Sequence, residues 1–119
     1  MEYMNILIPA LLFLFLVQRL LPTKGIRQIT TKELKNELKD NNKQFIDVRT
    51  PGEYKGNHIK NFKNIPLHEL SKKANELSKE KEVVVICQSG MRSNKGSKIL
   101  KKLGFKNVTN VKGGMSAWN

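Results

Sequence analysis

Four consecutive β-branched residues, Val83 to Ile86, constrain the fold of this chain more than any other feature. A run of this kind, without polar residues in alternation, is typical of a strand that is covered on both faces, as in a parallel sheet. A polar loop beginning at Cys87 follows directly, and a helical pattern with apolar residues on one face runs from about 93 to 103. Gly104 is placed to end that helix. The sequence therefore predicts a buried strand, a tight loop and a helix in succession.

The rest of the chain repeats this alternation of strand and helix. Strand patterns are predicted at 26–29, 44–48, 64–66 and 107–111, and helical patterns at about 30–40, 51–55 and 67–77. Thr30 with Glu33 three residues later resembles a capping box at the start of a helix. Alternating strands and helices predict an α/β fold with a central, mainly parallel sheet flanked by helices.

The first residues have a different character. Residues 4–21 are mostly apolar, and Ile6 to Val17 is unbroken. Eighteen helical residues reach about 27 Å, close to the roughly 30 Å core of a bilayer. No small-residue cleavage site follows, and basic residues such as Arg19 and Lys24 lie on the C-terminal side, which predicts an uncleaved membrane anchor with the following domain in the cytoplasm. The expected organisation is a transmembrane helix at 4–21, a linker at 22–26 and one domain at 27–119.

Charge and cysteine content narrow the function classes. The net charge is +12, but the eighteen lysines are spread along the chain and aromatic residues make up only 7%. This pattern favours a solvated surface, or attraction to anionic lipid headgroups, over nucleic-acid binding. A single cysteine excludes an internal disulfide and a thiolate zinc site, and the spacing of His58 and His68 is not that of metal ligands. We expect no metal and no cofactor.

The loop from Cys87 to Ser93 is the candidate site. Backbone N–H groups of a loop that leads into a helix converge on an anion, and the helix start with nearby Arg92 favours a cysteine thiolate. Four residues separate Cys87 from Arg92, whereas a tyrosine-phosphatase loop needs five, so the shorter ring suits a smaller electrophile such as sulfur. A thiol–disulfide oxidoreductase would need a second cysteine, and nothing directs His58 or His68 to act as the base of a cysteine hydrolase.

With these residues identified, the stretch from Ile29 to Trp118 resembles the single-domain rhodaneses, which are sulfurtransferases. Four motifs occur in the family's order: Asp47-x-Arg49 with Glu53-Tyr54, His58-Ile59 with Asn64-Ile65-Pro66, Cys87-x-x-Gly90-x-Arg92-Ser93, and Gly113-Gly114 with Trp118. The chain departs from the family at Asn57, where glycine is usual, and at Lys60-Asn61-Phe62, where Pro-Gly-Ala is usual.

The resemblance implies covalent catalysis by Cys87. Its thiolate would take a sulfur atom from a donor such as thiosulfate or a persulfide and pass it, as a Cys87 persulfide, to cyanide, a cellular thiol or an acceptor protein. The implied active loop consists of Gln88, Ser89, Gly90, Met91, Arg92 and Ser93. Arg92 would bind the anionic donor or stabilise the loop. Asp47, Arg49 and His58 are expected to support the site, not to react.

Two other functions stay open at this stage. The domain could be a non-enzymatic module that binds partners or senses sulfur at the membrane, although its intact cysteine argues against this. Arsenate reduction or phosphatase activity on the same fold is disfavoured by the short loop.

Overall fold

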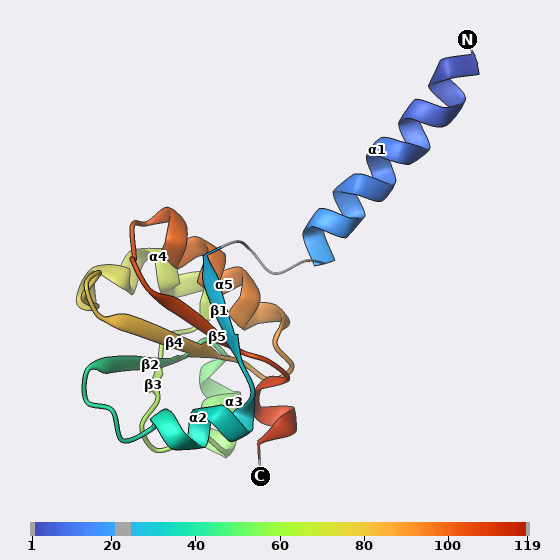
Figure 1. The fold of residues 1–119 in the computed structure, drawn as a ribbon. Coiled ribbons are helices and arrows are strands. Elements are labelled where there is room, and N and C mark those ends of the chain that lie inside the picture. The colour runs from blue at the N-terminus through green and yellow to red at the C-terminus, as the bar shows by residue number, and fades with distance from the viewer. Residues whose placement is uncertain (1, 21–24, 119) are drawn as a thin grey trace.

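A five-stranded sheet forms the centre of the protein (Figure 1). The computed structural model describes residues 2–20 and 25–118 of the 119. The strand order is β1-β5-β4-β2-β3, and every neighbouring pair is parallel. The strands are β1 (Ile26–Ile29), β2 (Lys43–Asp47), β3 (Lys63–Asn64), β4 (Glu82–Ile86) and β5 (Val108–Val111). The predicted α/β class with a parallel sheet is confirmed.

Strand β4 is the middle strand, and both of its faces are covered. Val83 to Ile86 are each 0% exposed. Val83 and Val85 pack in one apolar cluster together with Leu100 of α5 (Met91–Lys102), and Val84 and Ile86 pack in a second cluster on the other face. Full burial of one such side chain is worth about 1.5–3 kcal/mol, so these clusters hold β4 firmly in the centre of the sheet.

The first two short helices of the domain begin with capping boxes. Thr30 accepts a hydrogen bond from the Glu33 amide at the start of α2 (Thr31–Glu37), as predicted, and Leu34 is fully buried beneath it. Thr50 and Glu53 form the same arrangement at the start of α3 (Pro51–Gly56). Reciprocal hydrogen bonds of this kind satisfy helix amides that would otherwise lack partners.

The segment predicted as one helix at 67–77 is divided into three pieces. These are a 3₁₀ turn (Leu67–Glu69), α4 (Leu70–Lys73) and a second 3₁₀ turn (Ala74–Glu76). The apolar residues at 67 and 70, and at 74 and 77, are three positions apart, which suits the three-residue turn of a 3₁₀ helix. The predicted apolar face is nevertheless present, because Leu70 and Ala74 are buried in the core.

The N-terminal residues form a helix, but the predicted membrane anchor is wrong. Helix α1 (Glu2–Leu20) covers nearly the whole predicted span of 4–21. However, no helix within residues 2–20 and 25–118 combines the length and apolar character needed to cross a membrane. The physical reason is that the unbroken apolar stretch from Ile6 to Val17 rises only about 18 Å, against the roughly 30 Å of a bilayer core. The predicted location at a membrane depended on this anchor and is therefore also wrong.

The predicted linker at 22–26 is largely untested. Residues 22–24 lie outside the described residues, and Ile26 is already the first residue of β1.

Candidate active site

The carboxyl end of β4 delivers Cys87 to the site. Cys87 continues the alternation of the strand, so its side chain packs in the same cluster as Val83 and Val85 and is 0% exposed. The Gly90 amide donates a hydrogen bond to Sγ at 3.0 Å, and the Ser93 hydroxyl lies 3.3 Å from Sγ. The sulfur is thus held between the loop backbone and the first turn of α5.

Helix α5 begins without a side-chain cap. Its N-cap is Gly90, with φ +103, and no side chain bonds to the first-turn amides. This contrasts with α2 and α3, whose first turns are capped by Thr30 and Thr50. Uncapped N–H groups at a helix start attract negative charge, so the anion-binding geometry expected of the loop is available beside Cys87.

Ser93 links the sulfur to the loop. It is 0% exposed, and its hydroxyl donates to the Gly90 carbonyl oxygen at 3.2 Å. With its one proton used in this way, Oγ can accept from the Cys87 thiol; when the sulfur is ionised, the same proton can turn toward Sγ. Ser93 can therefore serve both protonation states of Cys87.

A glycine turn near the C-terminus of the chain, Gly113–Gly114, supports the cysteine loop. The Met115 amide donates to the Cys87 carbonyl oxygen at 2.8 Å, and the Ser116 amide to that of Gln88 at 2.9 Å. These bonds require a very close approach, since a Cβ atom on Gly114 would lie 2.2 Å from the Cys87 carbonyl oxygen. The close approach explains why this turn is built from glycine.

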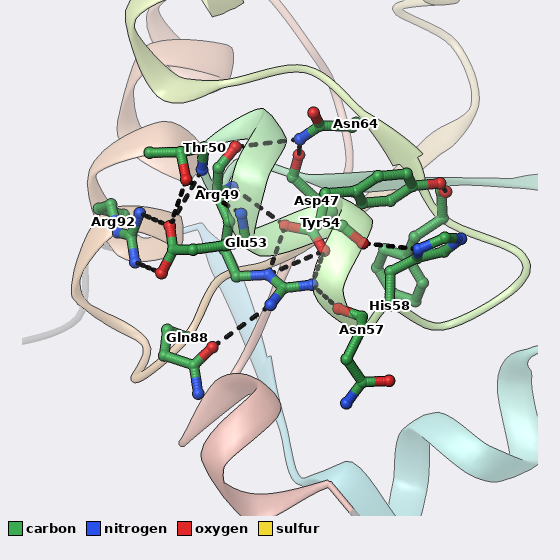
Figure 2. A network of polar contacts seen from close by, with 11 residues as sticks. Asp47, Arg49, Thr50, Glu53, Tyr54, Asn57, His58, Asn64, Gln88 and Arg92 are labelled. Carbon is green, nitrogen blue, oxygen red and sulfur yellow. Dashed lines mark hydrogen bonds and ion pairs between the residues drawn. The ribbon is translucent and has the colours of Figure 1, made fainter.

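Arg92 pairs with Glu53 of α3 (Figure 2). The two guanidinium nitrogens lie 2.6 and 2.9 Å from the two carboxylate oxygens. This bidentate pair, with help from Thr50, lowers the pKa of Glu53 from 4.5 to about 2 and raises the pKa of Arg92. The pairing connects the cysteine loop to α3, and the role of Arg92 toward a donor stays a prediction.

A buried ion pair between Asp47 and Arg49 links neighbouring loops near the site (Figure 2). Arg49 Nη2 lies 2.9 Å from Asp47 Oδ2, and the two side chains are 3% and 0% exposed. Arg49 also donates to the Asn57 carbonyl oxygen and, at 3.3 Å, to the Gln88 side chain in the active loop. Asn64 donates to the backbone carbonyls of both members of the pair. Arg49 therefore connects this ion pair to the active loop through Gln88.

His58 packs against Tyr54. Its ring stacks on Tyr54 with 3.8 Å between ring centroids, and Nδ1 lies 2.7 Å from the Tyr54 carbonyl oxygen. Ser89 and Met91 are the exposed members of the loop, Met91 being 82% exposed.

Sequence reasoning missed the functions of two residues. Glu53 belongs to the Glu53-Tyr54 motif, but nothing in the sequence indicates that it pairs with Arg92, because the contact joins positions 39 apart. No sequence pattern points to Ser116, yet its amide holds Gln88 in place. The repeated glycine at 113–114 was the available signal for that support.

Comparisons with known proteins agree with this geometry. The profile of the rhodanese-like domain matches residues 30–119. A sulfurtransferase of Allochromatium vinosum is 31% identical over 94 residues, covering 78% of this chain and 88% of the relative. The Bacillus subtilis protein YqhL is 41% identical over 75 residues, covering 63% of this chain and only 60% of that protein.

The fold also matches that of a solved structure. The crystal structure of a rhodanese-like domain protein from Staphylococcus aureus has a TM-score of 0.73 at 37% identity, covering 79% of this chain and 92% of that one. A profile match over three quarters of the residues, carried by the fold and the cysteine loop described above, shows that this chain belongs to the rhodanese-like family.

Proposed function

We propose that this chain is a sulfurtransferase that carries a sulfur atom as a persulfide on Cys87. One observation carries the proposal: Cys87 Sγ lies 3.0 Å from the Gly90 amide, beside the uncapped start of α5. A negative charge on sulfur is stabilised there by N–H groups that are already in place, as in an oxyanion hole.

The first step loads the cysteine. The Cys87 thiolate attacks the outer sulfur of a donor such as thiosulfate or a persulfide. The bond between that sulfur and the rest of the donor breaks, and its electron pair leaves with sulfite or a thiolate. The product is Cys87–S–S⁻, whose terminal charge is stabilised by the loop amides.

The second step unloads it. A nucleophilic acceptor, either cyanide in an assay or a thiol of a small molecule or protein, attacks the outer sulfur. The electron pair of the broken bond returns to Sγ and restores the thiolate, so the cycle is ping-pong and consumes no cofactor.

The neighbouring residues position the loop in this mechanism. The Ser93 hydroxyl can accept a hydrogen bond from the Cys87 thiol or donate one to the thiolate. Arg92 anchors the loop to α3 through Glu53. His58 acts as part of the scaffold, because its contacts are with Tyr54. Arg49, which is paired with Asp47, holds Gln88.

The test uses thiosulfate, cyanide and the full chain. The wild type should produce thiocyanate, and Cys87→Ser should abolish production while leaving the circular dichroism spectrum unchanged. Mass spectrometry after thiosulfate treatment should show the mass of one added sulfur on the wild type only. Full turnover by Cys87→Ser would refute the mechanism, and absence of the adduct would favour the alternative of a non-enzymatic binding module.

A further inference from the structure

A cavity of about 800 Å³ opens between α5 and the sheet, beside the active loop. Ser89, Gly90 and Met91 belong both to its wall and to the loop that holds Cys87. On the other side it is bounded by Gln28 of β1 and Asn110 of β5. Its volume is within the range of about 300–1,000 Å³ that is typical of small-molecule sites.

Lysine side chains line this cavity, which we call the lysine cavity: Lys95, Lys98, Lys102 and Lys112. Three of them are on α5 at intervals of three and four residues, so they share one helix face along with Met91 and Asn94. The sequence alone predicts only a solvated surface rich in lysine. Their position along one wall of a cavity gives them a common target.

None of these four lysines is neutralised by a residue that the structure describes. Among the described residues, no carboxylate lines the cavity, and none forms an ion pair with any of the four. By contrast, Arg27, Lys43 and Lys63 each have an acidic partner. Four unpaired cations around one hollow focus a positive potential into it.

Two asparagines, Asn94 and Asn110, add polar side chains to the wall of the lysine cavity. The side-chain nitrogen of Asn110 donates to the Gln28 side-chain oxygen at 2.9 Å. The side-chain oxygens of both asparagines are buried and accept no hydrogen bond from the described residues.

From these observations we infer that the lysine cavity binds a polyanionic thiol, which is the acceptor of the Cys87 sulfur. This inference rests on the proposed function and adds the chemical class of its acceptor. The distance along α5 from Met91 to Lys102 is about 16 Å, so a molecule with a charged body beside the lysines can place its thiol at the active loop.

The transfer step balances without any further reagent. The thiolate of the bound ligand attacks the outer sulfur of Cys87–S–S⁻ and forms a new sulfur–sulfur bond. The old bond breaks, and its electron pair returns to Cys87 Sγ. The products are the ligand persulfide and the free Cys87 thiolate.

The experiment measures sulfur transfer from the thiosulfate-loaded full chain to two thiols, coenzyme A as a polyanion and 2-mercaptoethanol as a neutral molecule. The pocket variant is Lys98→Gln with Lys102→Gln. The matched control is Lys72→Gln with Lys101→Gln, which removes the same charge from residues outside the lysine cavity. The pocket variant should transfer sulfur to coenzyme A on the order of tenfold more slowly, with transfer to 2-mercaptoethanol unchanged. The control variant should match the wild type with both thiols.

Equal slowing by both double variants would overturn the inference, because net charge would then explain the effect. Binding of coenzyme A to Cys87→Ser, measured by calorimetry, tests the lysine cavity separately from sulfur transfer by Cys87. Binding that the two lysine substitutions abolish supports the cavity even if no sulfur transfer occurs. Absence of binding to Cys87→Ser, with transfer by the wild type intact, would refute the cavity and leave the sulfurtransferase proposal standing.

Discussion

At the scale of residues, the site depends on two ion pairs with different surroundings. Asp47 and Arg49 are buried, whereas Glu53 and Arg92 are each about one-third exposed. A buried charge that loses its partner costs far more than an exposed one, because water cannot replace the partner. The two pairs should therefore respond differently to substitution.

The buried pair is the more vulnerable. Asp47→Asn leaves the Arg49 guanidinium buried without a countercharge and should lower the free energy of unfolding by about 3 kcal/mol. Urea unfolding followed by circular dichroism measures this. The control is Glu76→Gln, which breaks the exposed Lys63–Glu76 pair and should have little effect. Equal losses in the two variants would contradict the assigned difference in burial.

The exposed Glu53–Arg92 pair should make the stability of the protein depend on pH. The pKa of Glu53 is about 2 in the folded chain, below its ordinary value of 4.5. The stabilisation is therefore fully present above about pH 4.5 and is lost as pH falls through about 2. Wild type should exceed Glu53→Gln in stability by no more than about 1 kcal/mol at neutral pH, given solvent screening. Urea unfolding at several pH values should show the difference shrinking below pH 4.5; a constant difference would argue against the ion pair.

At the scale of elements, the sequence predicted the local structure well and the contacts between segments poorly. The apolar run in β4 and the Thr30 cap are local signals, and both were confirmed. The division of 67–77 was missed, because apolar residues three positions apart fit both an α-helix and a 3₁₀ turn. The Glu53–Arg92 pairing was missed because it depends on where α3 and α5 meet in space.

The support between the glycine turn and the cysteine loop can be tested directly. Gly114→Ala places a methyl group 2.2 Å from the Cys87 carbonyl oxygen, so the loop backbone must move. A displacement of about 1 Å can reduce a rate on the order of a hundredfold, and we expect a loss of this size in thiocyanate production. In Gly52→Ala the new methyl group meets nothing within 4 Å, and activity should be retained. A fully active Gly114→Ala would show that the loop tolerates the shift.

At the scale of the whole molecule, α1 and the sheet contribute unequally to the stability of the fold. The large apolar side chains from Tyr3 to Leu16 are each at least 50% exposed, so α1 buries little surface. In contrast, Ile26 and Ile29 of β1 are buried against the core. The sheet and its two apolar clusters therefore carry the stability of the fold.

Two truncations distinguish these contributions. A chain that begins at Gly25 should keep the unfolding midpoint of the full chain, since β1 is intact. A chain that begins at Thr30 loses the strand that pairs with β5 and should unfold at a clearly lower temperature. Differential scanning calorimetry measures both midpoints. A large drop on removing residues 1–24 alone would mean that α1 stabilises the sheet.

The pairing of β1 with β5 has a consequence for how the protein folds. Arg27 and Thr109 are hydrogen-bonded partners, although 82 positions separate them. Closing so long a loop costs entropy before any contact compensates for it, which slows folding in chains dominated by such non-local contacts. β5 also leads directly into the glycine turn that supports Cys87. The reactive cysteine should therefore acquire its final surroundings late in folding, when the two distant ends of the domain have met.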